Sequence, residues 1–135
     1  MKALEFKEQN LVYAKGQPQY LPLPCHRQAD GTATFGFELD FTELIKITRS
    51  KEIHLTILAF FTPIQPMRIS INKPALPITE QLEFMYTPMD EPENVFTFCK
   101  KLTPAQVEIL NLDKQIWVTV LTNNKPLHPI QMEVS

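Results

Sequence analysis

Residues 51–72 read KEIHLTILAFFTPIQPMRISIN, and residues 114–135 read KQIWVTVLTNNKPLHPIQMEVS. The two stretches align without a gap at an offset of 63 residues, which is 114 minus 51. When this offset is extended back to position 34, nine of 39 aligned positions are identical. Unrelated segments would agree at roughly one position in sixteen. The identical pairs are Thr34/Thr97, Phe35/Phe98, Leu39/Leu102, Lys51/Lys114, Ile53/Ile116, Thr56/Thr119, Leu58/Leu121, Pro63/Pro126 and Pro66/Pro129.

The apolar residues inside this unit recur with the period of a β-strand. Residues 53–59 carry apolar side chains on both faces of an extended chain, and so do residues 116–121. Both segments are therefore predicted to be strands in the centre of a sheet. Residues 67–71 and 130–134 alternate apolar with polar side chains, which indicates half-buried strands. Each copy has Pro-x-x-Pro between its two strands, which marks a loop or strand edge because proline has no N–H.

A short helix is predicted just before each central strand. Asp40 and Glu43 are spaced as a capping box, in which the two residues hydrogen-bond each other's backbone N–H groups. Thr103 and Gln106 stand at the same two places in the second copy. The predicted helices cover residues 41–48 and 104–111, and the strands that lead into them cover residues 32–39 and 95–102.

Each copy therefore reads as strand, short helix, strand, loop, strand. The predicted fold class is α+β, mostly β, with one domain (1–135) built of repeat 1 (1–73) and repeat 2 (74–135). A unit of this length buries a small share of its surface, so we expect the two repeats to share one core. A pseudo-twofold axis would relate them.

Outside the aligned region the chain offers further signals. Residues 11–13 predict a first strand, and Asp30-Gly31 predicts a hairpin turn. Three prolines keep QPQYLPLP, residues 17–24, extended, and we expect its side chains Tyr20, Leu21 and Leu23 to pack on the core. Residues 73–77 are predicted to link the repeats, and residues 82–86 to form another strand.

Composition limits the classes of function. The 135 residues are 44% hydrophobic and 21% charged, with a net charge of −2, which argues against a nucleic-acid surface. Three glycines leave no glycine-rich phosphate loop. No segment is long and apolar enough to span a membrane, and residues 1–10 do not resemble a secretion signal. Cys25 and Cys99 lack CxxC spacing and are interpreted as free thiols, so we predict a cytoplasmic protein.

Three segments resemble a group of small proteins from phages and bacterial mobile elements, whose function is unknown. The segments are QPQYLPLP at 17–24, SKEIHL at 50–55 and TPIQP at 62–66. The group carries Q-P-x-Y-x-P-L-P, Thr-Gly-Lys-Ile-Trp-Leu and Gln-Pro-Leu-x-Pro in that order. This chain departs from the pattern at Ser50 and His54, where the group has glycine and tryptophan. The resemblance covers about residues 11–73 and implies a mobile-element origin, with no reaction type and no functional residue.

Catalytic and metal chemistry find little support in the sequence. The three histidines, His26, His54 and His128, have no second ligand at a metal spacing such as H-x-x-x-H, so no metal and no cofactor are predicted. Cys25 and His26 are adjacent on an extended chain and point to opposite faces, which prevents a thiol–imidazole pair. Asp40 serves as a helix cap rather than a catalytic partner of Glu38. We therefore predict a protein that is not an enzyme, with an enzyme of unknown class as the third alternative.

Two kinds of binding site remain. Aromatic and apolar residues of the first Pro-x-x-Pro loop, Phe60, Phe61 and Ile64, predict a protein interface or self-association, and the second copy has Asn123-Asn124 in place of the phenylalanines. The leading hypothesis is a non-enzymatic binding protein that acts through this interface. The alternative is a protein that sequesters a small anionic or nucleotide ligand in a cleft between the repeats. The residues predicted to bind that ligand are Arg27, Arg49, Lys51, His54, Arg68 and Trp117.

Overall fold

The computed structural model describes residues 1–62, 64–79 and 94–134. Over these residues the protein is mixed α+β and mostly β, with two helices and nine strands. In chain order the elements are β1 (Lys2–Ala3), β2 (Leu11–Tyr13), β3 (Leu23–Arg27), β4 (Thr32–Glu38), α1 (Phe41–Ser50), β5 (Glu52–Leu58), β6 (Met67–Ser70), β7 (Val95–Lys101), α2 (Pro104–Asp113), β8 (Gln115–Leu121) and β9 (Ile130–Val134).

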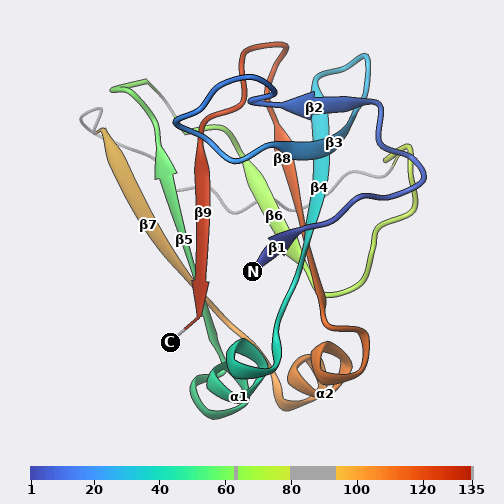
Figure 1. Ribbon diagram of the computed structural model, residues 1–135, viewed down its shortest axis with the longest axis vertical. Coiled ribbons are helices and arrows are strands. Elements are labelled where there is room, and N and C mark those ends of the chain that lie inside the picture. Colours follow the sequence, from blue (N-terminus) through green and yellow to red (C-terminus); the bar gives the residue numbers. More distant parts are fainter. Residues whose placement is uncertain (63, 80–93, 135) are drawn as a thin grey trace.

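The strands form two sheets in which every neighbouring pair is antiparallel. The larger sheet has the order β2-β3-β4-β8-β6, with β1 beside β4, and the smaller sheet has the order β7-β5-β9. Both helices lie at one end of the sheets, and the loops that follow β5 and β8 lie at the opposite end (Figure 1). The two strands predicted to be central, β5 and β8, each have a neighbour on both sides.

The two central strands differ in what covers their outer faces. On β8 both faces are buried, because Trp117 and Thr119 are each 1% exposed. The Phe6 ring packs edge-on against Trp117 with the ring centroids 5.1 Å apart. On β5 the core-facing side chains are buried, but His54 and Thr56 on the other face are half-buried. The central position predicted for both strands is therefore confirmed, but only β8 is buried on both faces.

Local capping signals account for the two helices. In α1 the Glu43 N–H donates to Asp40 Oδ1 at 2.8 Å, and the Asp40 N–H donates to Glu43 Oε1 at 3.0 Å. In α2 Thr103 and Gln106 make the same two bonds, at 3.2 and 3.0 Å. Each helix runs two residues further than predicted, and ends where a lysine adopts the left-handed conformation, Lys51 in α1 and Lys114 in α2.

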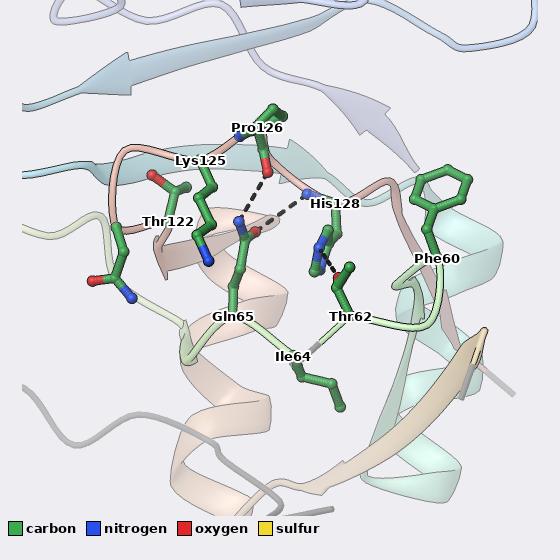
Figure 2. Close-up of a pocket in the computed structure, with 9 residues that line it drawn as sticks. Phe60, Thr62, Ile64, Gln65, Thr122, Lys125, Pro126 and His128 are labelled. Carbon is green, nitrogen blue, oxygen red and sulfur yellow. Dashed lines mark hydrogen bonds between the residues drawn. The ribbon is translucent and has the colours of Figure 1, made fainter. Parts of the chain in front are cut away.

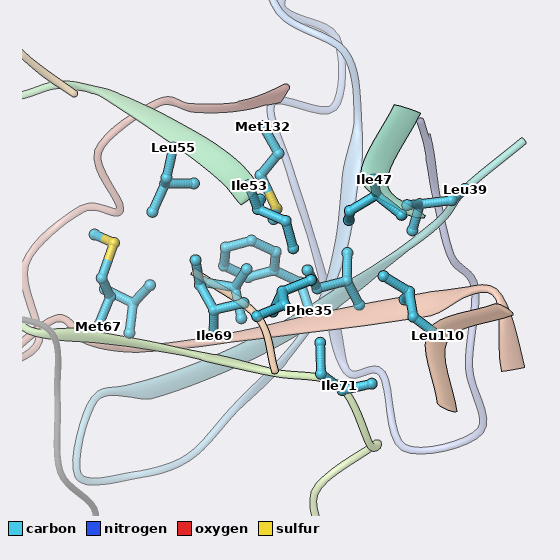
Figure 3. Packing of buried hydrophobic residues seen from close by; sticks show 14 of the residues in the cluster. Phe35, Leu39, Ile47, Ile53, Leu55, Met67, Ile69, Ile71, Leu110 and Met132 are labelled. Carbon is cyan, nitrogen blue, oxygen red and sulfur yellow. The ribbon is translucent and has the colours of Figure 1, made fainter. Parts of the chain in front are cut away.

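One hydrophobic core joins both sheets and both helices. Each helix buries two side chains, Leu44 and Ile47 from α1 and Val107 and Leu110 from α2. Figure 3 shows side chains from β5 and β9 meeting those from β4 and β6 in this cluster. Burial of each large side chain contributes about 1.5–3 kcal/mol to folding. The sheets and helices are therefore held mainly by this shared interior.

Some segments outside the core differ from expectation. The Asp30-Gly31 turn joins β3 to β4 as predicted, with Gly31 at a φ of 90°. The prediction that Leu21 packs on the core is wrong, because its side chain is 90% exposed. The prediction that residues 17–24 run extended is also wrong in its first half, because the Tyr20 N–H donates to the Gln17 carbonyl oxygen at 3.2 Å and closes a turn. The strand β3 begins after it, at Leu23. The strand predicted over residues 82–86 lies outside the described residues.

A close contact between β4 and β8 gives a stability prediction. Gly36 pairs with Trp117, and a Cβ added to Gly36 would lie 2.8 Å from Cδ2 and Cε3 of the indole. Because Phe6 blocks the ring on its outer side, the indole has little room to move. We expect Gly36→Ala to lower the free energy of unfolding by about 1–3 kcal/mol, measured by chemical denaturation.

The control is the same substitution in a Trp117→Leu background, which removes the ring that the new methyl group would strike. There Gly36→Ala should cost much less, because effects of residues in contact are not additive. An equal cost in both backgrounds would show that the contact with the indole is not the cause.

Candidate functional site

A cavity of about 400 Å³ lies between the loop after β5 and the loop after β8. Figure 2 shows side chains from both loops converging on it. Its walls combine aromatic, aliphatic, amide and cationic groups, which suits a ligand with both apolar and polar parts. The lining residues are Phe60, Thr62, Ile64, Gln65, Thr122, Asn123, Lys125, Pro126 and His128.

The Gln65 side chain fastens the two loops together. It is 7% exposed, so each of its polar atoms needs a partner within the protein. Its Nε2 donates to the Pro126 carbonyl oxygen at 2.9 Å, and its Oε1 accepts from the His128 N–H at 3.2 Å. Both bonds are drawn in Figure 2. The amide therefore fixes how the two loops face each other across the cavity.

Hydrogen bonding determines the tautomer of His128. The Thr62 hydroxyl donates its one proton to the Ala59 carbonyl oxygen at 2.6 Å, so it can only accept from His128 Nε2, 3.0 Å away. His128 Nε2 therefore carries the proton, and Nδ1 is a bare acceptor. Among the described residues this buried Nδ1 has no hydrogen-bond partner. Burial lowers the pKa of His128 below its usual value, so the ring is neutral at pH 7.

Positive charge gathers beside the second loop. Lys125 lines the cavity, and it is exposed to solvent. Arg27, at the end of β3, reaches the same loop, because its Nη2 lies 3.4 Å from the Lys125 carbonyl oxygen and 3.5 Å from Thr122 Oγ1. Its Nη1 donates to the Tyr13 hydroxyl at 2.9 Å, which orients the guanidinium. This end of the cavity therefore favours an anionic group.

The first loop carries two phenylalanines in an unfavourable backbone conformation. Phe60 and Phe61 have φ angles of 52° and 60°, and their side chains are 53% and 66% exposed. In the second loop Asn123 and Asn124 adopt φ angles of 53° and 61°. Asparagine tolerates this left-handed region, whereas a bulky residue there is an outlier. We call residues 59–62 the phenylalanine turn.

The residues predicted to bind an anion do not form one site. Arg49 lies in the last turn of α1, and Lys51 caps that helix at the far end from the cavity. His54 lies on the outer face of the smaller sheet. Arg68 and Trp117 lie on the outer face of the larger sheet, as the pairing of β6 with β8 places them. Of the six residues, Arg27 is the one that hydrogen-bonds a cavity loop.

Two predicted roles disagree with burial. Trp117 is 1% exposed, with Phe6 against its ring and Lys73 Nζ 5.7 Å from the ring centroid, so no face remains for stacking on a ligand. Ile64 is 3% exposed and lines the cavity, so it does not belong to an exposed interface. Phe60 and Phe61 are exposed, as an interface requires.

Sequence reasoning missed two groups of residues. The first group is the polar lining of the cavity, which includes Gln65, Lys125 and His128. Each of these residues directly precedes a proline of a Pro-x-x-Pro motif, and this spacing in the sequence could have identified them. The second group is Glu52 and Cys99, which lie beside His54, a residue predicted to bind an anion. The ligand atoms of the three residues all lie within 4.8 Å of one another. His54 and Cys99 are cross-strand partners, and sequence spacing within one strand does not show such a pair.

Comparisons with models of protein families, with curated proteins and with solved structures found no match to the chain. Within the described residues, neither helix has the length and apolar character that crossing a membrane would need.

The two cysteines should react very differently with a thiol reagent. Burial raises the pKa of the Cys25 thiol from 9.0 to about 12, whereas Cys99 is exposed. At pH 8 the folded protein should therefore react quickly at one thiol, and the unfolded protein at two. Since the folded pKa is the higher one, the contribution of the neutral Cys25 thiol to stability is complete below pH 9 and is lost as the pH rises towards 12.

Cys99→Ser should abolish the fast reaction, and Cys25→Ala should leave it unchanged. Fast labelling that persists in Cys99→Ser would mean that Cys25 is accessible and that its burial is wrong.

Proposed function

We propose that this chain is a non-enzymatic binding protein that contacts another protein through the phenylalanine turn. The observation that carries this proposal is the pair of exposed phenylalanines, Phe60 and Phe61, both at positive φ. A left-handed conformation costs roughly 1–2 kcal/mol for each ordinary residue. Strain of this kind is characteristic of functional positions rather than of positions selected for stability.

The loop after β8 shows whether this turn requires phenylalanine. Asn123 and Asn124 form the same turn, with φ angles within a degree of those of Phe60 and Phe61. The fold therefore does not require phenylalanine at either position. Exposed aromatic side chains that folding does not need are the usual anchors of protein interfaces. The phenylalanines are thus best explained by a partner surface that covers them, and a second copy of this chain is one form that the partner could take.

The proposal includes duplication of one unit about a pseudo-twofold axis. When each residue is exchanged for its counterpart 63 positions away, the Thr34–Thr119 pair between β4 and β8 becomes the Thr97–Thr56 pair between β7 and β5. The pairing of β6 with β8 recurs at the same offset as the pairing of β9 with β5. Equal registers in both sheets support one unit used twice.

Contacts between counterpart residues give independent support for the axis. On a twofold axis a residue meets its own equivalent, and two such meetings are present. Gln65 and His128 hydrogen-bond at one end of the molecule, and Thr48 and Asn111 at the other, each pair separated by 63 positions. The cavity then lies on the axis, and the phenylalanine turn is the feature that breaks its symmetry.

The proposed setting is the cytoplasm, for a protein of phage or mobile-element origin. The resemblance of residues 17–24, 50–55 and 62–66 supports the origin. The free thiols of Cys25 and Cys99 support a reducing compartment.

A second candidate is capture of a small anionic ligand, such as a nucleotide, in the cavity. The volume of about 400 Å³ falls within the range of known ligand sites. Lys125 supplies a cation, and the amide groups of Gln65 and Asn123 supply polar contacts. In this proposal the ligand binds to the loops after β5 and β8, and not to the six residues predicted from the sequence.

The leading proposal predicts the behaviour of a double variant, Phe60→Asn with Phe61→Asn, which copies the second loop into the first. Its melting temperature should equal or exceed that of the parent, because asparagine relieves strain at positive φ. Binding should weaken by at least about 2 kcal/mol, since the aromatic anchors are lost. The measurement is co-purification of partner proteins, with sedimentation to detect self-association.

The matched control is Phe41→Ala, which removes another exposed phenylalanine, 78% exposed, at the start of α1 and far from the turn. It should leave partner and size profiles as in the parent. If the double variant keeps the same partners and the same sedimentation, the phenylalanine turn is not the interface.

The second candidate predicts a thermal shift with nucleotides. A nucleotide at a hundred times its Kd should stabilise the fold by about 2.7 kcal/mol, which raises the melting temperature. Lys125→Met should remove most of that shift and make what remains less sensitive to salt, because one of the two cations at that end is lost. Lys46→Met, on the exposed face of α1, is the matched control and should bind like the parent. No shift at millimolar nucleotide would eliminate this candidate.

A further inference from the structure

The smaller sheet presents a row of metal-binding side chains on its outer face. Cys99 on β7 and Glu133 on β9 are the two cross-strand partners of His54 on β5. Glu52 precedes His54 by two residues and therefore points to the same face. Cys99 and Glu133 are exposed, while His54 and Glu52 are half-buried, so an ion can reach the row from solvent.

The distances are close to those of a formed site. Ligand atoms of Glu52, His54 and Cys99 lie within 4.8 Å of one another, and His54 Nε2 is 3.7 Å from Glu52 Oε2. Zinc binds sulfur at about 2.3 Å and nitrogen or oxygen at about 2.0–2.2 Å. Ligand atoms around a tetrahedral ion are therefore separated by about 3.5 Å. Small side-chain rotations at the surface would close the remaining gap.

We propose that Cys99, His54 and Glu52 bind a divalent transition-metal ion of the zinc class, with Glu133 or water as the fourth ligand. One thiolate, one imidazole and one carboxylate form a donor set of mixed softness, which favours Zn²⁺ over Mg²⁺ or Ca²⁺. The three ligands come from β5 and β7, and Glu133 would add β9. The ion therefore joins neighbouring strands of the smaller sheet.

The surrounding charges fit a bound dication. The thiolate with the Glu52 and Glu133 carboxylates carries three negative charges, and Lys101, the cross-strand partner of Glu52, offsets one of them. The remaining charge of about −2 matches a divalent ion. Glu133 Oε1 accepts from Gln131 Nε2 at 2.8 Å, which leaves its second oxygen for the metal.

The equivalent row of the larger sheet shows that the fold does not require these residues. In the larger sheet Trp117 has Gly36 and Ser70 as its two partners, in the places that Cys99 and Glu133 take beside His54. The Trp117 row is covered by Phe6, so it is an ordinary packed surface. The His54 row has no such cover among the described residues. The smaller sheet thus has exposed or half-buried metal-binding side chains where the larger sheet has the buried contact between Phe6 and Trp117.

Titration with Co²⁺ tests the proposal on the whole 135-residue chain in a phosphine reductant, which keeps Cys99 reduced. We expect one Co²⁺ per chain, with the near-ultraviolet charge-transfer band of a cobalt–thiolate bond and visible bands of tetrahedral cobalt. Zn²⁺ should abolish both by displacement and should raise the melting temperature. Cys99→Ser should remove the charge-transfer band, and His54→Gln should weaken binding by more than about 100-fold.

Cys25→Ala is the matched control, since it removes the other cysteine, which is buried, and should leave the spectrum unchanged. Melting curves without metal should be the same for Cys99→Ser and the parent, because Cys99 is exposed. The proposal is overturned if the parent shows no charge-transfer band, or if the band persists in Cys99→Ser. Neither spectroscopic result depends on the phenylalanine turn, so failure of the metal proposal would leave the proposed protein interface untouched.

Discussion

Each sheet takes its central strand from the other half of the chain, and the rest of the structure depends on this exchange. In the larger sheet β8 lies between β4 and β6, and in the smaller sheet β5 lies between β7 and β9. If β5 is removed, β7 and β9 lose their partner in the sheet. If β8 is removed, β6 loses its partner, and β4 keeps β1 and β3. Neither half can therefore complete its own sheet alone, and the long-range pairing makes folding of the halves mutually dependent. The exchange also brings the loops after β5 and β8 to the same end, where they enclose the cavity.

The outer faces of the two sheets determine which chemistry is exposed. Segments near the N-terminus and after β6 close the larger sheet, because Phe6 and Lys73 both contact Trp117, and Lys73 also pairs with Glu8. Buried on both faces, β8 can carry tryptophan and threonine without presenting them to solvent. The outer face of the smaller sheet keeps polar and ionisable side chains at the surface. The two sheets both pack apolar side chains on the inside and differ in the side chains of their outer faces.

Sequence reasoning succeeded where the controlling interactions are local. Capping boxes at Asp40 and Thr103, the Asp30-Gly31 turn and the alternation in the strands each involve residues a few positions apart, and these elements were predicted closely. Strand order was not predictable in this way, because pairing depends on residues far apart in the chain. The Cys99–His54 neighbour pair and the cover over Trp117 follow from that order. The exposure of Leu21 was missed for the same reason, since a proline excludes helix but does not determine what lies beside the chain.

The positions where the two halves differ coincide with the proposed binding surfaces. Core positions keep apolar residues in both halves, because a change of volume in a close-packed interior costs about 1–3 kcal/mol. Differences are tolerated where side chains leave the core, at the phenylalanine turn and along the outer row of the smaller sheet. At the turn the half-specific residues are aromatic, and along the outer row they are thiol, imidazole and carboxylate groups, which are the side chains that protein partners or metals use. The divergence is therefore consistent with the proposals made for the phenylalanine turn and for the outer row, on a scaffold that the shared core holds fixed.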